Sequence, residues 1–105
     1  MRTTVPTSVV IVVPARNEAD TLPACLASLR RARARAPVPT RIVVVLDDST
    51  DASASMTGGE DVVTVRCRNV GAARAAGFKF AGAADPDALL LCTDADCEVE
   101  PDWVQ

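Results

Sequence analysis

The chain contains no histidine and no pair of cysteines in Cys-x-x-Cys spacing. Both absences argue against a structural zinc site, which normally needs closely spaced ligands of these types. The four cysteines are Cys25, Cys67, Cys92 and Cys97. Cys25 falls on an expected core-facing helix position and Cys92 in an apolar run, so we interpret the cysteines as buried, reduced thiols. Reduced thiols are usual in a reducing compartment, and we therefore expect a cytoplasmic location.

Aromatic residues make up only 3% of the chain, and no apolar run approaches the ~20 residues that a membrane span requires. Hydrophobic residues nevertheless make up 49%, so valine, leucine, isoleucine and alanine must fill the core. The apolar stretch Val9–Val13 is too short for a signal peptide and runs directly into polar residues. A net charge of -3 argues against a general nucleic-acid binder. The 105 residues suit one small domain without a membrane segment.

Two hydrophobic periodicities alternate along the chain. Short aliphatic runs predict four strands, at Val9–Val13, Arg41–Leu46, Val62–Val65 and Ala88–Thr93. A spacing of three and four predicts a helix from Leu22 to Ala32, and an alanine-rich segment predicts another from Ala72 to about Ala83. We expect the polar segment Asp47–Asp51 to cap a further short helix.

This order predicts an α/β fold, with a mostly parallel sheet of about four strands and helices on both faces. Three of the strands end in polar clusters, at Pro14–Glu18, Asp47–Asp48 and Asp94–Asp96. Parallel strands end on one edge of their sheet, and open α/β sheets bind ligands at that edge. We therefore expect the three clusters to converge on one site.

The most informative cluster closes the sequence Ala-Leu-Leu-Leu-Cys-Thr-Asp-Ala-Asp at residues 88–96. The apolar run predicts a strand buried on both faces. In an extended segment, Asp94 and Asp96 would point to the same side and repel each other unless a cation joined them. Hard oxygen ligands favour Mg²⁺ or Mn²⁺, which usually keep waters and substrate phosphates as further ligands. We predict a metal–diphosphate site here in preference to a solvated turn.

Two further features are ambiguous on their own. Asp47 and Asp48 could cap a helix, or one of them could accept a hydrogen bond from a base or a ribose. Arg74, near the start of the second long helix, could hold phosphate or be an exposed helix arginine. The glycine spacing does not match a dinucleotide fingerprint, and there is no Walker loop.

Four segments of the chain resemble motifs of the family 2 glycosyltransferases, which have a GT-A type fold. They are Val-Pro-Ala-Arg-Asn-Glu at 13–18, Leu-Asp-Asp-Ser-Thr-Asp at 46–51, Asn-Val-Gly-Ala-Ala-Arg at 69–74 and Thr-Asp-Ala-Asp at 93–96. The resemblance implies that residues 1–105 form a Rossmann-like half-domain that binds a nucleotide-sugar. It also implies Mn²⁺ or Mg²⁺, a UDP-sugar as the expected donor, and inverting transfer to the hydroxyl of an acceptor that the sequence does not identify.

The resemblance also gives roles to particular positions. Asp96 would hold the metal, with Asp94 assisting or touching the ribose, and Arg74 would lie near the phosphates. The residues that would seat the nucleoside are Pro14, Ala15, Arg16, Glu18 and Asp47.

The chain also departs from the family pattern. The family usually has Asp-Asp-Gly-Ser-Thr-Asp in its second motif, so an ungapped alignment puts Asp47 at the base-contacting position and a gapped one puts Asp48 there. We predict Asp47. Cys97 stands where another acidic or polar residue is common. The family's general base lies in an acceptor-binding half, so we expect it beyond Gln105 and expect a truncated chain that is inactive alone. The strand at 88–93 would then lie at an exposed sheet edge, through which a homodimer could form.

Three alternatives stand beside this interpretation. A haloacid-dehalogenase-type phosphatase also places Asp-x-Asp after a buried strand, but the motif opens that domain and leaves Asp47 and Arg74 unexplained. A nucleotidyltransferase usually needs a Gly-rich loop with lysine after the first strand, which is absent here. A non-catalytic nucleotide-binding or interaction module is the third.

Many family members act at membranes, so the resemblance also implies membrane association of a longer parent protein.

Overall fold

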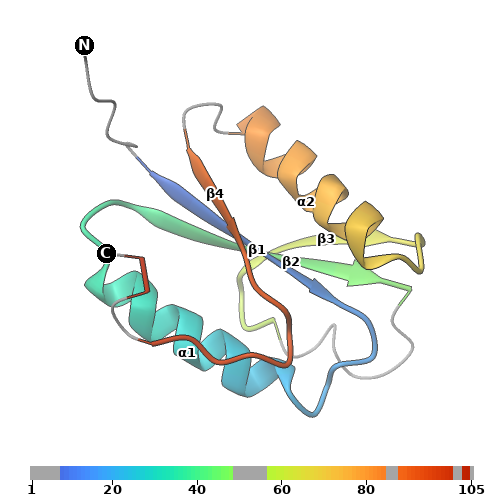
Figure 1. The fold of residues 1–105 in the computed structure, drawn as a ribbon, viewed down its shortest axis with the longest axis horizontal. Coiled ribbons are helices and arrows are strands. Elements are labelled where there is room, and N and C mark those ends of the chain that lie inside the picture. The colour runs from blue at the N-terminus through green and yellow to red at the C-terminus, as the bar shows by residue number, and fades with distance from the viewer. Residues whose placement is uncertain (1–7, 49–56, 85–87, 101–102, 105) are drawn as a thin grey trace.

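A four-stranded parallel sheet forms the centre of the molecule (Figure 1). The computed structural model describes residues 8–48, 57–84, 88–100 and 103–104. The strands are β1 (Val9–Ala15), β2 (Thr40–Asp47), β3 (Asp61–Val65) and β4 (Leu89–Cys92), and the helices are α1 (Leu22–Arg35) and α2 (Val70–Ala84). All pairs are parallel in the order β3-β2-β1-β4, which confirms the predicted α/β fold. Most of the predicted short helix after β2 lies outside the described residues.

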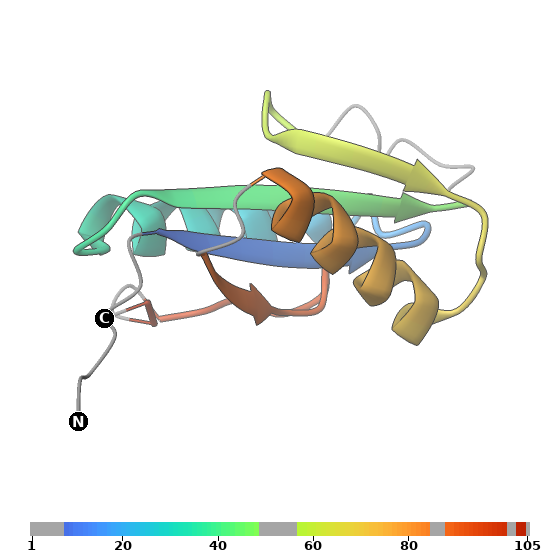
Figure 2. The same ribbon diagram turned by 90° about the horizontal axis from the view of Figure 1, so that it is seen from above.

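The two helices cover opposite faces of the sheet, as predicted. Figure 2 looks onto the sheet, with α2 in front of it and α1 behind. Alternate residues of a strand point to opposite faces. The side chains packed on the α1 face include Ile11, Val13, Val44, Leu22, Leu26 and Leu29. Those on the α2 face include Val10, Val12, Val43, Val45, Ala73 and Ala81. Both cores are aliphatic, as the scarcity of aromatic residues required.

Gly77 sets how closely α2 packs on the sheet. A Cβ at this position would contact Val12 and would lie 2.8 Å from Cγ2 of Val45. Only glycine avoids this overlap, so it fixes the height of α2 above β1 and β2. The helix begins two residues earlier than predicted because the Asn69 side chain accepts the N–H of Ala72 at 2.9 Å and caps the first turn.

The predicted burial of β4 on both faces is wrong. Leu89 is 45% exposed, and the other residues of β4 are half-buried. Among the described residues β4 pairs with β1 alone, so it lies at the sheet edge. A continuous apolar run fits a central strand and an apolar edge strand equally well, and hydrophobic pattern alone does not separate them. The exposed apolar edge was expected, while a homodimer through it stays a prediction.

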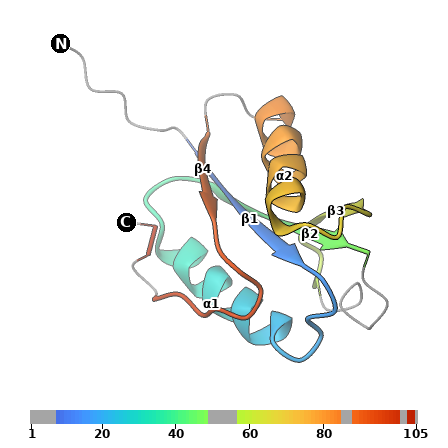
Figure 3. The ribbon, with the colours of Figure 1, turned by 45° about the vertical axis from the view of Figure 1, so that its right-hand side comes forward.

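The segment after β4 turns back along α1 (Figures 1 and 3). The N–H of Val99 donates to Ser28 Oγ at 3.1 Å, and this hydroxyl donates to the carbonyl of Cys25 at 2.7 Å. Val99, Trp103 and Val104 pack against the core beneath α1. The helix therefore supports the residues on the C-terminal side of the Asp94–Asp96 motif.

Glu60 ties α1 to the residues that precede β3. Its carboxylate accepts hydrogen bonds from Arg30 Nε at 2.8 Å and from Arg33 Nη1 at 2.7 Å. Burial raises the pKa of Glu60, but the hydrogen bonds from the two arginines outweigh it and hold the pKa below its ordinary value. Two of the arginines of α1 are therefore structural.

The four cysteines are free thiols in different surroundings. Cys25 is buried as predicted, and burial raises its pKa to about 11, so the thiol stays protonated near neutral pH. The expectation of burial is wrong for Cys67 and Cys97, which are exposed, and holds only in part for the half-buried Cys92. Cys67 follows the edge strand β3, and Cys97 follows the turn after β4, where little structure covers them.

Candidate functional site

A cavity of about 350 Å³ opens where the three polar clusters meet, at the carboxyl ends of β1, β2 and β4. Every site residue predicted from the sequence lines it: Pro14, Ala15, Arg16, Glu18, Asp47, Arg74, Asp94 and Asp96. Residues more than 80 positions apart in the chain thus share one hollow because the strands are parallel. The structure brings these residues together, while their individual roles stay predictions.

The end of β1 forms one wall and leads directly into α1. Ala15 is buried as the last residue of β1, and Asn17 turns the chain with φ 54°. Glu18 then organises the first turn of α1: its carbonyl accepts the N–H of Leu22 at 2.8 Å, and its Oε2 accepts the Thr21 hydroxyl at 2.9 Å. Arg16 lies exposed between Ala15 and Asn17 and gives this wall a cationic side chain.

The end of β2 places a buried carboxylate at the back of the cavity. Asp47 is 3% exposed. Its Oδ1 accepts the backbone N–H groups of Cys67 at 2.6 Å and Arg68 at 2.8 Å, and its Oδ2 accepts that of Asn69 at 3.0 Å. Burial by itself would raise the pKa of Asp47, but these three hydrogen bonds outweigh it, and the pKa lies below its ordinary value. Asp47 is therefore ionised at neutral pH.

Asp48 faces away from this arrangement. It has φ 52°, its N–H donates to the carbonyl of Val65 at 2.8 Å, and its carboxylate pairs with Arg68. This hydrogen bond from Arg68 lowers the pKa of Asp48. The residue does not line the cavity. Of the two carboxylates that the alignment left open, Asp47 is the one that the cavity reaches.

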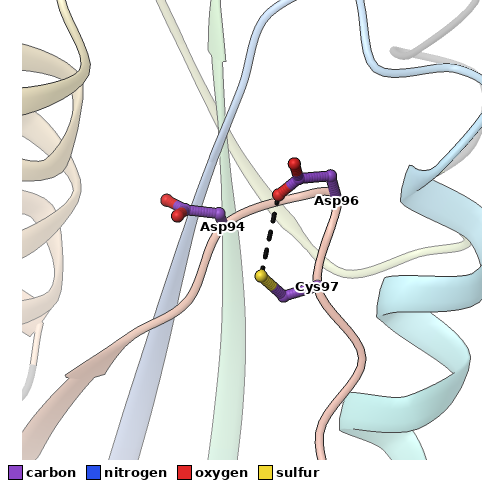
Figure 4. Close-up of side chains that lie close together, drawn as sticks. All are labelled: Asp94, Asp96 and Cys97. Carbon is purple, nitrogen blue, oxygen red and sulfur yellow. Dashed lines mark hydrogen bonds between the residues drawn. The ribbon is translucent and has the colours of Figure 1, made fainter.

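The Asp94–Asp96 motif forms a turn after β4, and the expectation of an extended segment is wrong. The strand ends at Cys92, and the N–H of Cys97 donates back to the carbonyl of Asp94 at 3.0 Å. Ala95 is buried at 3% exposure, while Asp94 and Asp96 are exposed on either side of it. Figure 4 shows the three polar side chains around this turn, with the Cys97 thiol directed at Asp96. The small residue between the carboxylates lets the turn sit on the core.

The donor atoms at this turn fit a divalent cation. Within the described part of the chain, Asp94, Asp96 and Cys97 each offer one donor atom, and these atoms lie within 4.8 Å of one another. Carboxylate oxygens suit Mg²⁺ and Mn²⁺, and the thiol is a softer donor that would favour Mn²⁺ of the two. The carboxylates are exposed, so water or substrate oxygens have room to complete a coordination shell.

Arg74 connects α2 to the turn. Its Nη2 lies 2.9 Å from Oδ1 of Asp94, and both side chains are about half exposed at 41% and 53%. The guanidinium thus places a positive charge directly beside Asp94. Its Nε is buried and has no hydrogen-bond partner among the described residues. Arg74 is therefore held at the cavity with part of its hydrogen-bonding capacity unused.

Comparison with known families shows which family the chain belongs to. A family model described as "Glycosyl transferase family 2" matches residues 10–105, which include every residue that lines the cavity. The chain belongs to glycosyl transferase family 2. A comparison with curated proteins finds no match.

Membership of glycosyl transferase family 2 confirms the resemblance drawn from the four motifs and the Rossmann-like, GT-A type architecture. It also removes the main support for the phosphatase and nucleotidyltransferase alternatives. Among the described residues, neither helix of this family 2 chain has the length and apolar character to cross a bilayer.

Sequence reasoning missed part of the cavity of this family 2 chain. Arg68, Asn69, Val70 and Ala73 also line it, from the loop before α2 and the first turns of that helix. The motif at 69–74 indicated the region but not these residues. No sequence pattern shows that Arg68 has φ 49° or that its N–H points to Asp47, because both follow from the pairing of β2 with β3.

Proposed function

We propose that this family 2 chain binds the nucleoside diphosphate of an activated sugar together with Mn²⁺ or Mg²⁺, as the donor side of a glycosyltransferase. One observation carries the proposal. A paired carboxylate motif and an arginine from the first turns of a helix line one cavity at the strand ends, where Arg74 lies 2.9 Å from Asp94. Carboxylates, a divalent ion, arginine and a helix N-terminus are together the groups that hold diphosphates.

Each residue has a place in this arrangement. Asp96 would hold the ion with Asp94 beside it, and Arg74 would pair with phosphate oxygens. The nucleoside would lie against the β1 wall and the β2 end, which are formed by Pro14, Ala15, Arg16, Glu18 and Asp47. We take the base to be uridine from the family resemblance, and we place the chain in the cytoplasm because its cysteines are free thiols.

The reaction we propose is inverting transfer of the sugar to an acceptor hydroxyl. The hydroxyl oxygen bonds to the anomeric carbon from the face opposite the diphosphate, the bond to the diphosphate oxygen breaks, and a general base takes the hydroxyl proton. A bound divalent ion supplies charge neutralisation for the leaving diphosphate. Arg74 adds a hydrogen-bonding cation on the same side. We assign the base to no described residue of this chain.

Calorimetric titration of UDP into the chain, with and without Mn²⁺, tests the proposal. We expect binding that depends on Mn²⁺ in the wild type and that Asp96→Asn removes. Asp61→Asn is a matched control, because Asp61 begins β3 at the opposite end of the strands and pairs with Arg41. The control should bind as the wild type does. UDP binding that ignores both Mn²⁺ and Asp96→Asn would contradict the proposed site.

A further inference from the structure

The backbone of residues 67–69 forms an anion-binding hollow that the protein fills with its own carboxylate. Three successive N–H groups, of Cys67, Arg68 and Asn69, converge on Asp47 at 2.6, 2.8 and 3.0 Å. The central residue, Arg68, has the left-handed conformation with φ 49°. Successive N–H groups around such a residue make a concave nest that elsewhere binds phosphate and other anions. Here the bound anion is Asp47.

This engagement leaves Asp47 little capacity for a ligand. A carboxylate offers about four lone pairs, and three of them meet the nest. Asp47 is also buried, at 3% exposure. A ligand that took the place of these N–H groups would break three backbone hydrogen bonds to a buried, ionised carboxylate, and hydrogen bonds to charged groups are among the stronger ones in proteins.

We propose that Asp47 is a positioning residue, which acts on the ligand through the loop it holds and not through a contact with the base. This inference rests on the proposed function and gives one of its residues a different role. The loop in question, residues 67–69, leads without a break into α2. Its position therefore decides where the start of α2 lies relative to the cavity.

Asn69 makes the mechanical connection between the nest and the helix. Its N–H belongs to the nest, its side-chain Oδ1 accepts the N–H of Ala72 at 2.9 Å, and its carbonyl accepts that of Ala73 at 2.9 Å. Asp47 thus holds the first turn of α2 through one residue. Arg74 follows directly on that turn and reaches the phosphate side of the cavity. If the three hydrogen bonds to Asp47 break, Arg74 and the N-terminus of α2 both shift relative to the Asp94–Asp96 turn.

This role makes a specific prediction for the variant Asp47→Asn. A base contact would affect UDP and leave a ligand without a base untouched. A positioning role would weaken every diphosphate by the same factor, because the groups displaced are those that hold phosphate. The experiment is titration of UDP and of inorganic pyrophosphate, each with Mn²⁺, into the full 105-residue chain and its variant.

We expect the dissociation constants of UDP and pyrophosphate to rise together in Asp47→Asn, by about tenfold or more. Asp61→Asn, which removes the same charge far from the cavity, should change neither. Loss of UDP affinity with unchanged pyrophosphate affinity would overturn the inference and restore the base contact, while the proposed function would stand. Unchanged affinity for both ligands would also overturn it. A wild type that binds neither ligand would overturn the proposed function itself.

A second measurement needs no variant and covers the case in which Asp47→Asn does not fold. Amide hydrogen exchange of Cys67, Arg68 and Asn69 is followed by NMR with and without UDP and Mg²⁺. A positioning residue keeps its hydrogen bonds, so the three amides should exchange at least as slowly when UDP is bound. Faster exchange on binding would show that Asp47 leaves the nest for the ligand, and would contradict the inference.

Discussion

Two strand ends of the same sheet carry carboxylates that look alike in the sequence and differ in the structure. At the end of β2, Asp47 is 3% exposed and holds three backbone N–H groups. At the end of β4, Asp94 and Asp96 are exposed, and the hydrogen bonds of the described residues give each a single side-chain donor, from Arg74 and Cys97. The hydrogen-bonding capacity of Asp47 is largely filled without a ligand, whereas that of Asp94 and Asp96 is not.

The difference follows from strand position. β2 lies in the interior of the sheet between β1 and β3, so the loop after β3 closes over its end and brings N–H groups to Asp47. β4 lies at the edge among the described residues, so its end meets water. A buried carboxylate must be satisfied by the fold, whereas an exposed one keeps lone pairs for a cation. The comparison teaches that burial, more than residue type, separates structural acids from ligand-binding ones here.

The largest expected effect tests this contrast through stability. Asp47→Ala would leave three N–H groups without their acceptor and should lower the free energy of unfolding by about 3 kcal/mol. Asp96→Ala removes an exposed carboxylate from the turn and should leave the free energy of unfolding unchanged within error. Urea denaturation followed by circular dichroism measures both. Equal destabilisation by the two variants would contradict the distinction between a structural Asp47 and a non-structural Asp96.

A smaller effect is the loss of stability at acidic pH. Asp47 and Glu60 have pKa values below their ordinary 3.8 and 4.5 in the folded chain. Their contribution to stability is therefore full above about pH 5 and is lost as the pH falls through the lowered values, because the unfolded state then binds more protons. Denaturation between pH 6 and pH 2.5 should show this loss in the wild type.

Variants locate the groups responsible for that acid loss. Asp47→Asn should flatten the fall of stability with decreasing pH, Glu60→Gln should flatten it separately, and the two changes should add because the sites share no partner. A wild-type slope that both variants retain would show that neither carboxylate has a lowered pKa.

The sequence predicted the sheet and the gathering of the site far better than the state of each residue in it. Val9–Val13 and Arg41–Leu46 specify strands by their composition, and parallel topology then places Pro14, Asp47 and Asp94 at one edge. Local pattern does not report tertiary neighbours, so it missed that β4 is only partly buried and that Asp94–Asp96 is a turn. The same limit hid Arg68 and Asn69, whose role depends on N–H groups directed at a carboxylate some 20 residues away in the sequence.

The smallest expected effect concerns the affinity of the β4 turn for Mn²⁺ and rests on the proposed metal site. It tests whether the ion pair of Asp94, which Asp96 does not share, influences that affinity. Arg74 pairs with Asp94, so a divalent ion and the guanidinium compete for the same carboxylate. Arg74→Gln should therefore tighten the binding of Mn²⁺ alone by about fivefold. The same variant should weaken UDP in the presence of Mn²⁺, because the phosphates lose their arginine. Electron paramagnetic resonance of free Mn²⁺ measures the first effect, and calorimetry measures the second.

Arg68→Gln distinguishes competition from a general change of charge. Arg68 lines the same cavity and carries the same charge, but its carboxylate partner is Asp48. If Arg74 competes directly, Arg68→Gln should change Mn²⁺ affinity much less than Arg74→Gln, and Asp94→Asn should abolish the gain in the Arg74→Gln background. Equal gains from both arginine variants would mean that the ion senses only the overall field of the cavity. The ion pair between Arg74 and Asp94 would then have no direct effect on metal binding. The exposed carboxylates of the β4 turn would bind the ion without regard to their protein partners, whereas Asp47 is held by its own.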